Sequence, residues 1–233
     1  MCVRGVWCSR TELRSRLLVG PEGASLSKSI YVVTHPEATH HIDGVVGGWF
    51  DSELTERGVE QAEAIAVELA TRLDGAPVEI LSSDLLRARR TAEAIAKRLQ
   101  VGVTLDPDLR EKSYGEAEGK PQAWLRERII PIPEVGERLR HDEGIPGAET
   151  RMELAERAYR VIDGIQHSPQ EQHILVTHGG TSTLLIAAWI GMPINAAGQV
   201  NFKVSSGSIT VLRKDSRNFS HQLAHLNDVR HLA

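Results

Sequence analysis

The chain has 233 residues, enough for one large α/β domain or, as the alternative, two small ones. Its formal net charge of −4 argues against a nucleic-acid partner, and no apolar run is long enough to cross a bilayer, so we expect neither a nucleic-acid-binding nor an integral membrane protein. Both cysteines, Cys2 and Cys8, lie near the start of the chain. A disulfide framework is therefore not expected, and a cytoplasmic location is predicted.

Residues 1–28 differ in composition from the rest and are predicted to form a flexible N-terminal extension ahead of a domain over residues 29–233. Arginines are interspersed with serine and glycine there, and no sustained apolar stretch follows them. A secretory signal needs such a stretch, and residues 17–19 are too short to supply it. An early start codon is the alternative explanation of this segment.

Four short apolar runs predict buried strands, at residues 30–33, 78–81, 174–176 and 209–212. The first of four predicted helices opens at the N-cap Thr55 and keeps an apolar stripe to residue 73. The others are expected over residues 85–99, 149–165 and 181–190. Because strands alternate with helices, the sequence predicts a three-layer α/β fold, with a mostly parallel sheet covered by helices on both faces.

The segment 120–146 interrupts this alternation. Trp124 and several arginines are surrounded there by Pro121, Pro131, Pro133 and Pro146. Such a composition is typical of an irregular lid or cap over a site, not of a core element. We call residues 120–146 the lid segment.

Two histidines directly follow predicted strands, His35 after the first and His178 after the third. Ligands of parallel α/β sheets bind beyond the carboxyl ends of the strands, so we expect both imidazoles to point into one crevice. A single histidine in such a place is more often structural. Two in equivalent places, the second followed by Gly179 and Gly180, favour a functional site.

Five short motifs occur in order along the chain. They are Thr34-His35-Pro36-Glu37 with Leu54-Thr55-Glu56-Arg57-Gly58, then Ser82–Ala92, Leu109–Gly115, Gly147–Thr150 and Val176–Gly180. Their order and spacing over residues 29–213 resemble the histidine phosphatase superfamily, the phosphoglycerate mutase-like phosphoryl-transfer enzymes. Each motif alone is weak, and the five in order are specific.

The resemblance implies a role for each matching residue. His35 would attack phosphorus in line and carry the phosphoryl group as a phosphohistidine. Arg87 would bind phosphoryl oxygens in a bidentate manner, a cationic His178 would hold further charge, and Gly179 would line the substrate site. Glu111 would protonate the leaving alcohol and then take a proton from water. No cofactor is implied.

The opening motif departs from the family pattern at Thr34, Pro36 and His41, where the family has arginine, glycine and asparagine. The missing arginine forfeits a charge-assisted hydrogen bond of roughly 1.5–3 kcal/mol, and Pro36 has no backbone N–H. We expect compensation by the hydroxyls of Thr34 and Thr39 and by one protonated imidazole, that of His41, as phosphate ligands. Altered substrate chemistry and loss of activity are the alternatives.

A metal site is a further interpretation of this region. His35, His40, His41 and Asp43 are residue types that bind zinc or iron. Adjacent side chains such as His40 and His41 usually diverge, however, and the family needs no metal. We therefore predict that no metal is bound.

The leading functional hypothesis is a cofactor-independent phosphatase acting on a small phosphorylated metabolite. A phosphomutase of the same superfamily is the first alternative. It needs a second anionic pocket, for which the lid segment offers Arg126, Arg128, Arg138 and Arg140. The second alternative is a catalytically silent relative that binds a phosphorylated ligand or a protein partner. The oligomeric state is left open, a homodimer included.

Overall fold

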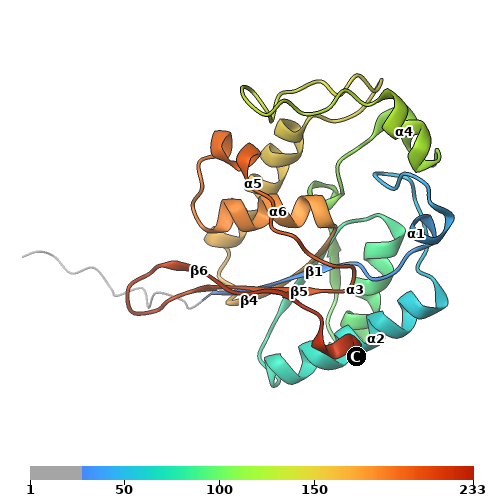
Figure 1. Cartoon of the computed structure of the whole chain (residues 1–233). Coiled ribbons are helices and arrows are strands. Elements are labelled where there is room, and N and C mark those ends of the chain that lie inside the picture. Colours follow the sequence, from blue (N-terminus) through green and yellow to red (C-terminus); the bar gives the residue numbers. More distant parts are fainter. Residues whose placement is uncertain (1–27) are drawn as a thin grey trace, which may run out of the picture.

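The computed structural model describes residues 28–233, so the predicted N-terminal extension lies outside the described residues except for Lys28. One six-stranded sheet has the strand order β3-β2-β4-β1-β5-β6 (Figure 1). Its strands are β1 (Ser29–Thr34), β2 (Glu79–Ser82), β3 (Val103–Leu105), β4 (Gln172–Thr177), β5 (Ile209–Lys214) and β6 (His221–Asp228). The strands from β3 to β1 are parallel, whereas β5 and β6 run antiparallel to their neighbours. The predicted α/β fold with a mostly parallel sheet is confirmed.

Helices cover both faces of the sheet (Figure 1). One face packs against α2 (Glu56–Leu73) and α3 (Leu86–Leu99), the other against α5 (Arg151–His167) and α6 (Gly179–Trp189). Side chains of β1 alternate between the two layers: Ile30 and Val32 face α5 and α6, while Tyr31 and Val33 face α2 and α3. The shorter helical elements are α1 (Thr39–Asp43), α4 (Gln122–Arg128) and the 3-10 turns Pro107–Leu109, Gly115–Ala117, Ile194–Gln199 and Arg230–Leu232.

The start of α2 is tied to the opening motif. Thr55 is the N-cap, as predicted, and its Oγ1 accepts a hydrogen bond from the Gly58 N–H at 2.9 Å. The same hydroxyl donates to Glu37 Oε1 at 2.7 Å. A Cβ on Gly58 would lie 2.0 Å from the Glu37 carbonyl oxygen, so glycine is required for this close approach. The Leu-Thr-x-x-Gly pattern therefore anchors the loop that follows His35.

Some elements differ from the sequence-based expectations. β3 has three residues and β6 has mostly exposed or half-buried side chains, so neither edge strand carries an apolar pattern. The lid segment, predicted to be irregular, contains α4, which begins after Pro121 and ends before Pro131. Within residues 28–233, no helix combines the length and the apolar character needed to cross a membrane.

Candidate active site

The carboxyl ends of β1 and β4 lie side by side and present the two histidines that follow them. Thr34 and Thr177 are register partners at these ends, and the His35 N–H donates to the Thr177 carbonyl at 3.0 Å. As a result, the His35 and His178 rings lie edge to face, with centroids 5.0 Å apart. Both side chains are buried and both line a cavity of about 440 Å³, which we call the first cavity. It occupies the place beyond the strand ends where ligands of such sheets bind.

The first cavity brings together nearly all of the predicted site residues. Its walls include Thr34, His35, His41, Arg87, Glu111, His178 and Gly179. Thr39 is the exception: it begins α1, its N–H donates to the Glu53 carbonyl at 2.9 Å, and its side chain is not part of the wall. The sequence could place Thr39 near His35, but only the direction of the short helix decides which of its side chains reach the cavity.

Hydrogen bonds at both ring nitrogens of His35 define its tautomer. Nδ1 lies 2.8 Å from the Pro36 carbonyl oxygen, which can only accept, so Nδ1 carries the hydrogen. Nε2 then holds an electron pair, and Arg87 Nε donates to it at 3.2 Å. Burial, followed by the charge of Arg87, lowers the pKa of His35 well below its usual value. His35 is therefore neutral at pH 7, with Nε2 as the nucleophilic atom.

Arg87 is fixed beside this nucleophile by the loop after α1. Its side chain is buried, and its terminal nitrogens donate to the carbonyl oxygens of Gly48 at 2.7 Å and Phe50 at 2.8 Å. Burial lowers the pKa of Arg87 to about 10, which still leaves the guanidinium cationic at pH 7. A positive charge is thus held in place next to the atom that would receive a phosphoryl group.

His178 is the N-cap residue of α6 and approaches His35 from β4. Its Nε2 lies 2.9 Å from Ser83 Oγ, and its buried Nδ1 has no hydrogen-bond partner among residues 28–233. Burial and then the charge of Arg87 lower the pKa of His178 well below its usual value. The protein groups alone therefore favour a neutral His178, not the cation implied by the family. A phosphoryl dianion would favour the protonated form, since an opposite charge raises the pKa of an imidazole.

The carboxylate of Glu111 is held at the start of α6. Oε2 accepts from the Gly180 N–H and Oε1 from the Lys112 N–H, both at 2.9 Å. A Cβ on Gly180 would lie 2.4 Å from Glu111 Oε1, so a glycine at this position leaves room for the carboxylate. Glu111 is consequently held in the cavity wall instead of turning to solvent, as a general acid–base group requires.

His41 replaces the family's asparagine and lies against the nucleophile. Its ring stacks on that of His35, with centroids 5.6 Å apart and an interplanar angle of 14°. Nδ1 accepts from the Ala38 N–H at 3.2 Å, so the neutral ring carries its hydrogen on Nε2. Burial and then Arg87 lower the pKa of His41. The protein groups therefore favour a neutral N–H donor here, whereas we had expected a protonated imidazole.

Three imidazoles have the spacing of a metal site, because the ligand nitrogens of His35, His40 and His41 lie within 4.8 Å of one another. Asp43 does not belong to this group. An ion bound to His35 Nε2 would displace the hydrogen bond that Arg87 Nε donates to this atom, and it would lie beside the Arg87 cation. These contacts favour the prediction that no metal is bound.

Arg157, which sequence reasoning missed, supports the loop that carries Glu111. This buried residue of α5 pairs with Glu149 at 2.8 Å. It also donates to the main-chain oxygens of Asp108, Arg110 and Glu111. Glu149 belongs to a recognised motif, but nothing in the spacing of the sequence indicates that its partner reaches three carbonyl groups of another loop.

Replacing Arg157 with methionine should lower the free energy of unfolding by about 3–5 kcal/mol, because the Glu149 carboxylate, only 12% exposed, loses its ion-pair partner. Arg160→Met is the matched control. Arg160 pairs with Asp108 on the surface, and its loss should cost at most about 1 kcal/mol. Urea unfolding followed by circular dichroism measures both values. Equal losses in the two variants would contradict the structural role of Arg157.

Comparison with known proteins identifies the family. A model of the histidine phosphatase superfamily (branch 1) matches residues 30–228. The chain belongs to this superfamily. The matched range contains all of the site residues described above, from His35 to Gly180.

Proteins similar to this chain carry both mutase and phosphatase names. The probable phosphoglycerate mutase GpmB of Erwinia tasmaniensis is 30% identical over 183 residues, covering 75% of this chain and 80% of the relative. The mycobacterial glucosyl-3-phosphoglycerate phosphatase solved with VO3 has a TM-score of 0.71 at 25% identity, covering 87% of this chain and 100% of that one. The α-ribazole phosphatase of Shigella flexneri has a TM-score of 0.67 at 27% identity, covering 86% and 96%.

Proposed function

We propose that this histidine phosphatase hydrolyses a small phosphorylated metabolite and that His35 is the residue that becomes phosphorylated. The observation that carries the proposal is the 3.2 Å contact between Arg87 Nε and His35 Nε2, in a cavity that also holds His178 and Glu111. A fixed cation beside a neutral nucleophile suits attack on a phosphate monoester. The reaction needs no cofactor.

In the first step, His35 Nε2 attacks phosphorus in line with the ester oxygen. The N–P bond forms as the ester P–O bond breaks, and a protonated Glu111 gives its proton to the departing alcohol. Arg87 and His178 stabilise the charge on the phosphoryl oxygens. In the second step, Glu111 takes a proton from water as the water oxygen attacks phosphorus. The N–P bond breaks, and inorganic phosphate and neutral His35 are released.

Two observations favour hydrolysis over transfer between two hydroxyls. Of the four lid arginines that a mutase could use for a second anion, Arg126, Arg128 and Arg140 are exposed and line neither the first cavity nor the one that contains Arg138. The two solved relatives described above carry phosphatase names. The curated relative carries a mutase name, so the test has to separate the two reactions.

Phosphate release from a panel of phosphorylated metabolites, with and without a bisphosphate primer, separates the candidates. We expect release of inorganic phosphate that needs no primer. Isomerisation that depends on the primer would identify a mutase. A protein that binds these esters but converts none of them would be a catalytically silent relative.

Substitutions of His41 test whether the altered opening motif contributes to binding of the phosphoryl group. His41→Ala removes the Nε2–H donor, and we expect kcat/KM for 4-nitrophenyl phosphate to fall about 10- to 100-fold, the scale of one hydrogen bond to a charged group. His41→Asn retains an N–H donor and should keep most of the activity. Full activity of His41→Ala would rule out His41 as a phosphate ligand.

The pH dependence of kcat/KM distinguishes a neutral His41 from a cationic one. Because burial and the charge of Arg87 lower the pKa of His41, the free protein loses this proton at a lower pH than an ordinary imidazole does. No decline attributable to His41 is therefore expected as pH rises from about 6.5 to about 8. A decline over that window that disappears in His41→Asn would show that the cation binds the substrate.

A further inference from the structure

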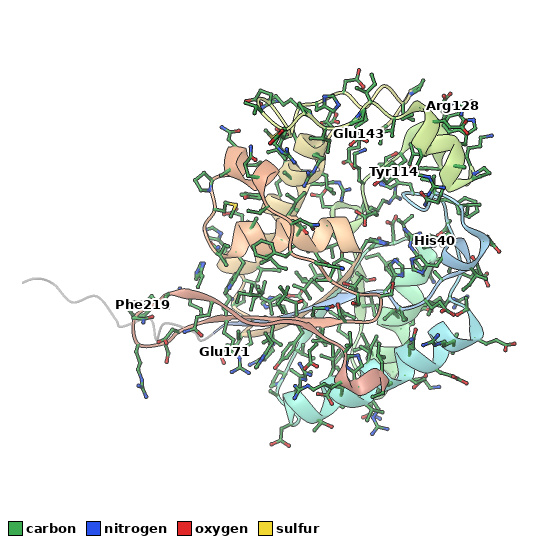
Figure 2. The ribbon with its side chains drawn as sticks, viewed as in Figure 1. His40, Tyr114, Arg128, Glu143, Glu171 and Phe219 are labelled. Atoms are coloured by element: carbon green, nitrogen blue, oxygen red, sulfur yellow. The ribbon has the colours of Figure 1, made fainter. Side chains whose placement is uncertain are left out.

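A second cavity lies beyond Glu111, and the phosphoryl chemistry does not use it. Its volume is about 470 Å³, and it shares Glu111 and Tyr114 with the first cavity. Tyr114 lies between α1, which carries His40, and the part of the lid segment that carries Glu143 (Figure 2). Since Glu111 protonates the leaving oxygen in the proposed reaction, the rest of the alcohol lies at the entrance of this second cavity.

The second cavity is larger than a short alcohol requires. Ligand sites for compact organic molecules span roughly 300–1,000 Å³. The second cavity reaches this size without counting the volume of the first. Leu154, Leu184 and Val200 provide an apolar part of its wall, and Gln199 and Asn201 provide amide groups. Such a wall suits a molecule with both C–H surfaces and several hydroxyl groups. A three-carbon alcohol would leave most of it filled with water.

Positive charge exceeds negative charge in this wall. Lys112, Arg138 and Arg151 line it, opposed by Glu143 and by Glu111 at the junction. Lys112 Nζ is paired with Glu143 at 2.7 Å, and both side chains are almost fully buried. This lysine is therefore neutralised by the protein and offers little to a ligand.

Within residues 28–233, neither arginine of this wall forms an ion pair, and Arg151 is the one that no backbone carbonyl holds either. It is the first residue of α5, and within residues 28–233 its side chain has no ion pair, because the nearby Glu143 and Glu149 are paired with Lys112 and Arg157. Arg138, by contrast, is held by the carbonyl oxygens of Gly198 and Pro133 through Nε and one terminal nitrogen. The other terminal nitrogen of Arg138 has no bond among those residues.

We propose that the alcohol part of the substrate carries a carboxylate, which Arg151 binds with the help of Arg138. The amides of Gln199 and Asn201 bind its hydroxyl groups. The substrate class is thus a phosphorylated polyhydroxy acid with more than three carbons. A guanidinium without a counter-ion recognises a carboxylate through two parallel hydrogen bonds. This inference rests on the proposed phosphatase function and adds the chemistry of the leaving group.

Two substrates that differ only at one end of the carbon chain test the contribution of the carboxylate. 6-Phosphogluconate and sorbitol 6-phosphate have the same carbon chain and differ at the end far from phosphorus, where the first has a carboxylate and the second a hydroxymethyl group. We expect kcat/KM to favour the acid by about 10-fold or more. 3-Phosphoglycerate, which has the carboxylate on a shorter chain, should be a poorer substrate than 6-phosphogluconate. A parent enzyme that prefers sorbitol 6-phosphate would overturn the proposal.

The matched variants are Arg151→Gln and Arg140→Gln. Arg151→Gln should reduce the ratio of kcat/KM for the acid to kcat/KM for the polyol about 10- to 100-fold. The substitution removes the positive charge and one of the two parallel hydrogen bonds to the carboxylate. Arg140 is an exposed arginine of the lid segment, outside the wall of the second cavity, and its replacement should leave the ratio unchanged. Equal losses on both substrates in Arg151→Gln would show that Arg151 has a structural role only.

Binding measurements keep this inference separate from the proposed reaction. Calorimetric titration of the two six-carbon phosphates needs no turnover and can be made with His35→Ala as well as with the parent. If no member of the panel of phosphorylated metabolites is hydrolysed, the phosphatase function fails. Tighter binding of the acid that is lost in Arg151→Gln would still support the carboxylate site. Equal binding of acid and polyol, or no binding of either, overturns it.

Discussion

His35→Ala is expected to lose turnover by about 10⁶-fold, the scale on which another covalent hydrolase loses activity with its nucleophile. The Nε2 atom of His35 is the neutral electron pair that the structure holds beside Arg87, and alanine offers no group in its place. Rapid quenching without acid, using a substrate labelled in its phosphoryl group, should trap labelled protein from the parent. The label should be acid-labile, as expected for a phosphohistidine, and absent from His35→Ala.

His167→Ala is the control for this experiment. His167 is an exposed histidine in the last turn of α5, and it lines neither of the two cavities. Its replacement should change neither the rate nor the labelling. If His35→Ala is as active as the parent and still becomes labelled, the nucleophile is another residue.

Glu111→Gln is expected to slow hydrolysis of alkyl phosphates by about 10²–10⁴-fold, the usual contribution of general acid–base catalysis. An alkoxide is a poor leaving group and needs a proton, whereas 4-nitrophenolate leaves without one. The loss in the phosphorylation step should therefore be much smaller for 4-nitrophenyl phosphate. Single-turnover kinetics measure that step for each substrate, and Glu116→Gln, at an exposed position of the neighbouring turn, is the control.

The dependence on the leaving group is essential because glutamine also alters the local hydrogen bonds. Both carboxylate oxygens of Glu111 accept from backbone N–H groups, of Gly180 and Lys112. The amide nitrogen of glutamine would face one of these donors, and the side chain would shift. A shift alone would slow both substrate types equally. Equal losses would therefore exclude Glu111 as the acid while leaving it a role in positioning.

Much of the sheet and its helices could be predicted because their signals are local. The apolar run from Ile30 to Val33 and the apolar stripe after Thr55 depend only on neighbours along the chain, and both elements formed where they were expected. The edge strands β3 and β6 were not predicted, because their own sequences carry no such local signal. Their side chains are largely exposed, and pairing with a neighbouring strand makes them strands.

The candidate site could be predicted only in part. The rule that ligands bind beyond strand ends pointed to His35 and His178 from residue order alone. Arg87 and Glu111 were identified through their family motifs, since each would otherwise be one of many charged surface residues. Thr39 was predicted as a ligand from its position in the sequence, and the structure leaves its side chain outside the first cavity wall.

By itself, the sequence determined the family, the alternation of strands and helices, and the residue types available for phosphoryl transfer. Only the tertiary structure decided the tautomer of His35, the neutral form favoured at His41, and the support that Arg157 gives to the Glu111 loop. It also decided that Lys112 is paired with Glu143, whereas Arg151 has no ion pair in the described part of the chain. The physical reason is that periodicity and capping act between near neighbours in the chain. Burial, hydrogen-bond partners and pKa shifts depend on which distant segments meet, and these set the chemistry of the site.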